Sequence, residues 1–300
     1  MCLLWGTTYL AIRVGVATWE PFLFGGLRFA AAGTIVIFSL RLRNVRVPHD
    51  GGVLRDAAIT GTLLLVGGNA AVILAERHVP SGITAVMVST MPIWTVVIAS
   101  LTRGGPRLGP LNWMGLVAGL AGVVLLVWPS LTITRGPDRD FLWGVVVLQL
   151  GSISWAAGSV YASGRRMAVD PLLGAGLQML AGGVAMILIG TLLGEWSQLS
   201  PDRRGWEAFL YLLVFGSLMG YVAFVYALQH LPVAKVSLYG YVNPLVAVVV
   251  GAIILGEHFG GREAAATAIV LGAVALARRG GPAMPNGPAE ADAVVSSRPS

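Results

Sequence analysis

The stretch PVAKVSLYGYVNPLVAVVVGAIILGE, residues 232–257, decides how the fold of this chain is understood. It is long enough to cross a bilayer as a helix, which takes about 20 residues. Lys235, Tyr239 and Asn243 recur every four residues and therefore share one helical stripe, whereas 246–255 is almost purely apolar. Because polar groups are costly in lipid, we expect the stripe to face protein or a water-filled cavity. We interpret it as one wall of a path for a solute.

The composition of the whole chain indicates an integral membrane protein. Of its 300 residues 56% are hydrophobic and 11% are charged, against roughly 25% charged residues in a soluble domain. The net charge is +6, but the arginines lie between apolar stretches, so no nucleic-acid partner is expected. Cys2 is the only cysteine, which excludes a disulfide framework and a cysteine-based metal site.

Ten apolar stretches predict an all-α membrane protein with ten transmembrane helices in a lipid bilayer. They lie at about 1–16, 21–40, 57–75, 80–102, 111–128, 141–163, 171–194, 206–228, 232–255 and 262–279. The first stretch is short, and we expect the natural chain to begin upstream of Met1. The tail, 280–300, is rich in Pro, Gly and Ser and is expected to be disordered and cytoplasmic.

Arginines outside the apolar stretches predict the orientation in the membrane. With a cytoplasmic N-terminus, eleven lie inside: Arg41, Arg43, Arg46, Arg55, Arg103, Arg107, Arg165, Arg166, Arg278, Arg279 and Arg298. Six lie outside: Arg77, Arg135, Arg139, Arg203, Arg204 and Arg262. The excess of positive charge on one side places both termini in the cytoplasm.

The two halves of the chain resemble each other. Trp5 matches Trp155 and Pro21 matches Pro171 at an offset of 150, and Pro92 matches Pro244 at an offset of 152. We therefore predict two five-helix repeats, at 1–128 and 141–279, joined by a loop at 129–140. Because five is an odd number of spans, the second repeat must be inverted relative to the first. Inverted repeats are typical of secondary transporters, whose site lies between the repeats near the middle of the membrane.

The matched prolines, Pro92 and Pro244, lie in the middle of equivalent spans. A proline inside a helix frees a carbonyl and permits a kink. We predict that both are hinges for alternating access, although proline is also common in membrane helices without such a role.

Three stretches carry a family resemblance: WGTTYLAIRVGV, EPFLFGGLRFAAAG and KVSLYGYVNPLVAVVVGAIILGE. Together they resemble the EamA branch of the drug/metabolite transporter superfamily, and the likeness covers residues 1 to about 279. The resemblance implies a ten-helix carrier in a bacterial inner membrane that exports amino acids, other metabolites or drugs. It also implies a cavity walled by the first, third, fourth, sixth, eighth and ninth spans.

Charged residues inside the spans are positive. Every acidic residue falls at a loop or the end of a span, which makes export of cationic drugs less favoured than in relatives with an intramembrane glutamate. Arg13, Arg28 and Lys235 lie within spans. One of them, Lys235 above all, is hypothesised to meet an anionic group of the substrate. Arg13 and Lys235 are alternatively close enough to span ends to reach the interface, and Arg28 to pair with backbone carbonyls.

The candidate binding residues share positions on predicted cavity walls. They are Trp5, Tyr9, Asn69, Met87, Met91, Trp155, Tyr221, Lys235, Tyr239 and Asn243. A polar stripe opposite the methionines suits an amphipathic small molecule, such as an amino acid with an apolar side chain. Alternatives stay open: the tryptophans as interfacial anchors, the methionines as packing, and Asn69 and Tyr221 as interhelical hydrogen bonds.

No motif for catalysis or ATP binding is present, so neither an enzyme nor an ATP-driven pump is expected, and no cofactor or metal. A membrane-embedded enzyme and a multidrug exporter remain the alternatives to a metabolite carrier. Gly115 and Gly119 form a G-x-x-x-G pattern, so either a monomer or a homodimer is expected.

Overall fold

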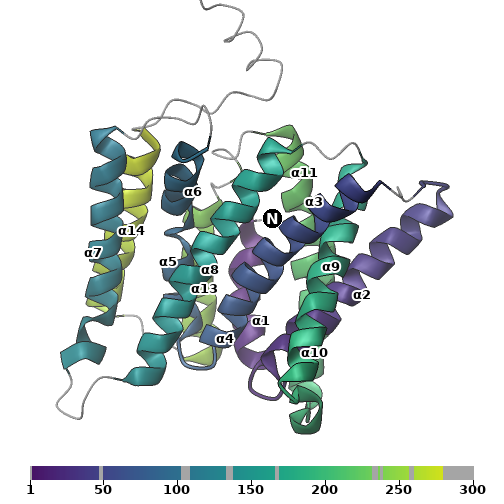
Figure 1. Cartoon of the computed structure of the whole chain (residues 1–300). Coiled ribbons are helices and arrows are strands. Elements are labelled where there is room, and N and C mark those ends of the chain that lie inside the picture. The colour runs from purple at the N-terminus through teal and green to yellow at the C-terminus, as the bar shows by residue number, and fades with distance from the viewer. Residues whose placement is uncertain are drawn as a thin grey trace, which may run out of the picture.

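The computed structural model is built of helices packed side by side (Figure 1). It describes residues 2–46, 50–102, 109–132, 138–165, 169–231, 236, 239–256 and 260–279, and among these it contains no strand. The main elements are α1 (Cys2–Gly15), α2 (Pro21–Leu42), α3 (Gly51–Gly61), η1 (Thr62–Asn69), α4 (Ala70–Ala75), α5 (Ser81–Val88), α6 (Met91–Ser100), α7 (Pro110–Thr132), α8 (Arg139–Gly164), α9 (Pro171–Leu192), η2 (Glu195–Gln198), α10 (Arg203–Tyr211), η3 (Leu212–Tyr221), α11 (Val222–His230), α13 (Tyr239–Leu255) and α14 (Gly261–Arg279).

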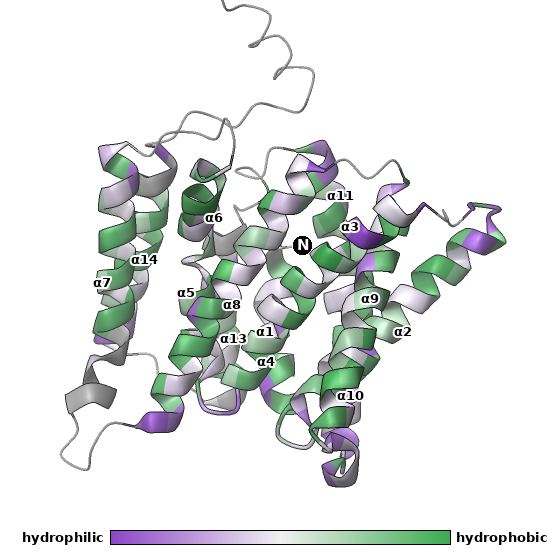
Figure 2. Cartoon of the chain, viewed as in Figure 1, coloured by the Kyte–Doolittle hydropathy of each residue, from purple (hydrophilic) through white to green (hydrophobic). Residues whose placement is uncertain are grey.

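Within the described residues, six helical stretches are long and apolar enough to cross a membrane. They are Pro21–Leu42, Gly51–Ala75, Ser81–Ser100, Arg139–Gly164, Pro171–Leu192 and Arg203–His230. Two shorter apolar helices cover Pro110–Leu125 and Asn243–Ile254. Hydrophobic residues run along the middle of the helices and hydrophilic ones gather toward their ends (Figure 2). The prediction of an all-α membrane protein is confirmed, whereas the count of ten spans stays a prediction.

The helix expected to begin at residue 57 begins at Gly51 instead. The reason is local: Asp50 is an N-cap whose carboxylate accepts a hydrogen bond from the Gly52 amide at 2.8 Å. Arg55, which was expected in a loop, therefore lies on α3 and bonds the carboxylate of Asp56. The expectation that Arg55 belongs to a basic loop was wrong.

Two long helical stretches switch to π-helix in the middle. The π-helical segments are η1 (Thr62–Asn69) and η3 (Leu212–Tyr221). Their first residues are 150 positions apart and their last residues 152, which are the offsets of the sequence repeat. A π-helix is rare and is often found at functional sites, because its wider turn displaces the side chains that follow.

Helices α2 and α9 pack with their backbones in direct contact. A Cβ atom added at Gly33 would lie 2.6 Å from the Leu180 amide nitrogen and 2.7 Å from the Gly176 carbonyl oxygen. One added at Gly183 would collide with the Ala30 backbone. Glycine is required at these positions because membrane helices approach this closely only through small residues.

The predicted hinge prolines occupy different environments. Pro244 lies inside the continuous helix α13. Pro92 lies in the first turn of α6, just after an interruption that separates α5 from α6. The interruption falls at Ser89 and Thr90, whose backbones stay near helical geometry. Neither observation tests a hinge role, which stays a prediction.

Helices α7 and α14 pack against each other at one side of the molecule (Figure 1). α7 exposes large apolar side chains, among them Trp113, Met114 and Val117. A soluble protein rarely exposes such a patch, whereas a lipid-facing helix requires one. The largest buried cluster lies elsewhere, around α1, α2, α9 and η3, and the central cavity adjoins it.

Candidate functional site

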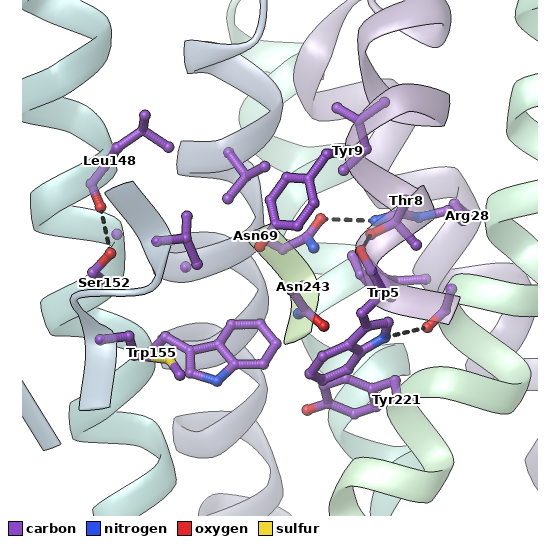
Figure 3. Close-up of a pocket in the computed structure, with 18 residues that line it drawn as sticks. Trp5, Thr8, Tyr9, Arg28, Asn69, Leu148, Ser152, Trp155, Tyr221 and Asn243 are labelled. Carbon is purple, nitrogen blue, oxygen red and sulfur yellow. Dashed lines mark hydrogen bonds between the residues drawn. The ribbon is translucent and has the colours of Figure 1, made fainter. Parts of the chain in front are cut away.

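A central cavity of about 70 Å³ lies where helices from both halves of the chain meet (Figure 3). This is several times the roughly 10–15 Å³ that one water molecule occupies on the same scale. Its lining residues come from α1, α2, η1, α4, α5, α6, α8, η3 and α13. They are Trp5, Thr8, Tyr9, Ile12, Arg28, Phe29, Gly68, Asn69, Val72, Val88, Met91, Leu148, Gly151, Ser152, Trp155, Gly216, Tyr221 and Asn243.

Arg28 brings a positive charge to the wall of this cavity. Its side chain is buried, its Nη2 donates a hydrogen bond to Asn69 Oδ1 at 2.7 Å, and its guanidinium lies 4.3 Å from the centre of the Phe29 ring. The alternative that it pairs with backbone carbonyls was wrong, since its hydrogen bond goes to a side chain. Helix α2 was also not expected to reach the cavity, and Arg28 and Phe29 show that it does.

The second half of the chain makes the corresponding contact. Tyr221 Oη donates to Gln178 Oε1 at 2.9 Å, and both side chains are buried. Gln178 follows Arg28 by 150 residues and Tyr221 follows Asn69 by 152. Asn69 and Tyr221 are each the last residue of a π-helical segment. Asn69 and Tyr221 each line the cavity and each form a hydrogen bond between two helices, so the two alternatives considered for them are both true.

Three aromatic rings pack together at the cavity, which two of them, Trp5 and Trp155, line. Trp5, Trp155 and Phe224 come from α1, α8 and α11, and their ring centres are 5.2 to 5.6 Å apart. Trp5 and Trp155 meet edge to face, an arrangement that aromatic pairs prefer. The two tryptophans are partly buried and line the cavity, and the alternative that they are interfacial anchors stays open.

Each of these tryptophans packs on a glycine of a π-helical segment. Trp5 lies against Gly220 of η3 and donates from Nε1 to the Gly216 carbonyl at 3.2 Å. Trp155 lies against Gly68 of η1, where an added Cβ would come within 2.7 Å of its ring. The indole N–H of Trp155 is buried and has no hydrogen-bond partner among the described residues. The contact is thus repeated between the halves, but its hydrogen bond is not.

Tyr9, Ile12 and Asn243 also line the cavity. Tyr9 lies within hydrogen-bonding reach of the Asn243 side chain and close to the carboxylate of Glu76, which is itself buried. One residue beyond Ile12, Arg13 donates to the backbone oxygen of Glu76. Trp5 and Ile12 are seven residues apart on α1, so the cavity extends about 10 Å along that helix.

Seven of the predicted binding residues are brought together by the cavity. They are Trp5, Tyr9, Asn69, Met91, Trp155, Tyr221 and Asn243. Met87 is fully buried and packs with Val79 and Val86, so it does not line the cavity. Lys235 and the side chain of Tyr239 lie outside the described residues. A role in binding stays a prediction for all ten.

Several lining residues were missed, among them Thr8, Phe29 and Ser152, and Arg28 was considered only as one of three intramembrane cations. Thr8 and Ile12 lie one and two turns from Trp5 on one face of α1, so helical spacing contained that information. Ser152 lies one turn from Trp155 and bonds its own helix at Leu148 O. Arg28 and Phe29 carried no comparable pattern, because their helix was assigned no role in the cavity.

A second cavity, of about 460 Å³, lies where the end of α1 meets the starts of α5 and α10. Arg13, Thr18, Asp202 and Arg204 are among its lining residues. Thr18 Oγ1 donates to the Asp202 carboxylate at 3.3 Å. With two arginines and one aspartate, the described lining of this cavity carries a positive balance.

Comparison with known proteins agrees with this architecture. The EamA-like transporter family matches residues 1–128 and, again, residues 142–279. The inner membrane transporter YedA of Escherichia coli (strain K12) is 38% identical over 279 residues, which cover 93% of this chain and 88% of that protein. Protein PecM of Dickeya dadantii is 26% identical over 277 residues, covering 91% of this chain and 88% of PecM.

A solved crystal structure has the same fold. It superposes with a TM-score of 0.65 at 23% sequence identity, covering 92% of this chain and 94% of its own. The predicted resemblance to the EamA branch is confirmed by the two family matches and by the similarity to YedA. The chain therefore belongs to the EamA-like transporter family of the drug/metabolite transporter superfamily, a family of multi-pass membrane transporters of small molecules.

Proposed function

We propose that this protein is a secondary transporter that exports small metabolites across the bacterial inner membrane by alternating access. The cargo is an amino acid with an apolar side chain or a related amphipathic compound. The observation that carries the proposal is the central cavity, because helices of both halves line it and the two π-helical segments meet it at Asn69 and Tyr221.

An architecture of two inverted five-helix repeats with both termini in the cytoplasm accounts for these pairs. Arg28 with Asn69 and Gln178 with Tyr221 are related by the repeat offsets, as are Trp5 with Gly220 and Trp155 with Gly68. In such an architecture the repeats rock about a fixed central site.

The cavity lining favours a small amphipathic cargo. Asn243, Asn69 and Arg28 supply polar groups, while Val72, Val88 and Met91 supply an apolar surface. The described lining holds an arginine and no carboxylate, which disfavours the alternative of a cationic drug exporter.

Counterflow in proteoliposomes tests the proposal. Purified protein is reconstituted with an unlabelled amino acid inside, and uptake of labelled leucine, valine and phenylalanine is compared with uptake into protein-free liposomes. We expect protein-dependent uptake of at least one of them, and little uptake of the cationic dye ethidium. Uptake of ethidium alone would replace the metabolite carrier by a multidrug exporter.

Direction and the role of Lys235 need two further measurements. Cells that express the protein and are fed a dipeptide of the transported amino acid are expected to release that amino acid faster than control cells. Lys235→Ala is expected to lower counterflow, because a cation on the polar stripe of the ninth predicted span is a candidate partner for an anionic group. Unchanged counterflow in this variant would remove Lys235 from the site and leave the carrier intact.

A further inference from the structure

Arg28 is a buried cation at the cavity for which the described chain provides no opposite charge. Its side chain is 2% exposed, and its hydrogen bond goes to a neutral amide, Asn69 Oδ1, at 2.7 Å. Its Nε has no hydrogen-bond partner among the residues that the structure describes. None of the ion pairs between described residues includes it. The guanidinium therefore reaches the cavity wall with donor capacity left over.

A charge in this position is costly, and a charge that the fold does not neutralise needs another reason to be there. Arginine inside a membrane usually faces a polar cavity or a partner and marks the path of a substrate or ion. Its planar guanidinium fits a carboxylate through two parallel hydrogen bonds, which amides and hydroxyls do not offer. The missing partner of Arg28 is thus chemically defined as an anion.

The repeat shows that this charge is not needed to join the helices. At the equivalent place in the other half, Tyr221 donates to Gln178 at 2.9 Å, so a neutral pair connects the same kind of helix to its π-helical neighbour. Gln178 does not line the cavity, whereas Arg28 does. The first half therefore carries a charge that packing does not explain, on the side where a solute would bind.

The surroundings of Arg28 define the rest of the ligand. Aromatic and aliphatic side chains, including Trp5, Phe29 and Val72, make up most of the cavity wall, and the Phe29 ring lies against the guanidinium. The second cavity has two arginines against one aspartate among its described lining residues, which favours an anion there as well.

We infer that Arg28 binds the anionic group of the transported solute, a carboxylate attached to a compact apolar body, and that Asn69 holds the guanidinium in place before the solute arrives. This inference rests on the proposed function and names the residue that selects the cargo. Binding of the carboxylate would use the guanidinium donors of Arg28 that do not bond Asn69, while the apolar body would lie against Trp5, Phe29 and Val72.

The first test is selectivity in counterflow. For the amino acid that the wild type transports best, its carboxamide is added as an unlabelled competitor; leucinamide replaces leucine, for example. We expect the amide to compete at least tenfold more weakly than the acid. Arg28→Met is expected to lower transport by about 10- to 100-fold, the effect of losing a hydrogen bond to a charged group. Arg28→Lys should restore part of it.

Gln178→Met is the matched control for Arg28→Met. It removes the polar side chain at the equivalent position of the other half, which is buried but does not line the cavity. It is expected to keep the discrimination between acid and amide. Equal competition by acid and amide, or wild-type transport by Arg28→Met, would overturn the inference and leave the proposed transporter standing.

The second test needs no substrate. Thermal unfolding of the purified protein is compared with that of the double variant Arg28→Met with Asn69→Leu, which removes the charge together with its neutral partner. We expect an unfolding temperature equal to or above that of the wild type, as when a site residue is kept for function at some expense of stability. If the wild type transports no amino acid, the proposed cargo is wrong, but the unfolding temperatures still test the role of Arg28. An unfolding temperature several degrees lower in the double variant would show that Arg28 stabilises the fold, and would overturn the inference.

Discussion

Arg28 donates to Asn69, and at the equivalent positions of the other half Tyr221 donates to Gln178, so the same contact occurs twice with donor and acceptor exchanged. In the first half the donor lies on α2 and the acceptor ends η1. In the second half the donor ends η3 and the acceptor lies on α9. The two contacts hold the π-helical segments to α2 and α9, the helices that pack backbone to backbone.

The neutral pair makes a stability prediction. Tyr221→Phe leaves the buried Gln178 side chain without its donor, and we expect the free energy of unfolding to fall by about 1–3 kcal/mol. Replacing both residues, Tyr221→Phe with Gln178→Leu, removes the orphaned group and is expected to recover part of the loss. Chemical unfolding of the two single variants and the double variant measures the coupling. Additive losses would mean that the hydrogen bond contributes nothing.

The tryptophan–glycine contacts predict a loss of transport. Gly220→Ala and Gly68→Ala each add a methyl group where an indole now lies, so Trp5 or Trp155 must move. We expect counterflow to fall several-fold in both variants. Gly272→Ala is the control, because an added Cβ there meets nothing within 4 Å. If all three variants transport equally well, the positions of Trp5 and Trp155 are not important for transport.

Glu195 joins the two halves at the start of α2. Its carboxylate accepts from the backbone amides of Phe22 at 3.2 Å and Leu23 at 2.8 Å, and the side chain is buried. A carboxylate on the first amides of a helix satisfies donors that have no partner within the helix, and it interacts favourably with the helix dipole.

Glu195→Ala is therefore expected to lower the free energy of unfolding by about 1–3 kcal/mol. Glu195→Gln keeps an acceptor and loses the charge, so its effect should be smaller. Glu207→Gln provides the control: Glu207 pairs with Arg203 on an exposed helix surface, where about 0.5 kcal/mol or less is expected. An equal effect of Glu195→Ala and Glu207→Gln would show that the cap is not important.

Much of the fold follows from local patterns in the sequence. The ends of α2, α8 and α9 lie within two residues of the predicted boundaries, because long apolar stretches and prolines at helix starts are strong local signals. The π-helical segments could not be predicted in this way. Thr62–Asn69 and Leu212–Tyr221 are apolar like any membrane helix, and their wider turn depends on what packs against them.

The cavity residues also fall into those that the sequence pattern predicts and those whose position depends on packing. Trp5, Asn69 and Tyr221 were found because the repeat relates them to residues of similar size or polarity in the other half. Arg28 was recognised as an intramembrane charge, but its place at the cavity depends on how closely α2 approaches the centre. That approach is set by glycine contacts with α9, and so by packing between distant parts of the chain rather than by any local pattern.

The predicted hinges are expected to differ in strength. Pro244 lies inside α13 and removes a backbone N–H from the helix, whereas Pro92 lies in the first turn of α6, where proline is well tolerated. The break before Pro92 is further supported by Thr90, whose hydroxyl donates to the Met87 carbonyl at 2.8 Å.

Pro244→Ala should therefore restore the backbone hydrogen bond that the proline removes from α13, with an unfolding temperature equal to or above that of the wild type and a counterflow rate several-fold lower. Pro92→Ala should change both quantities less, because the interruption does not depend on the proline alone. Counterflow rates and thermal unfolding of the two variants check this. A Pro244→Ala protein that transports at the wild-type rate would show that α13 moves as a rigid helix and that alternating access bends the protein elsewhere.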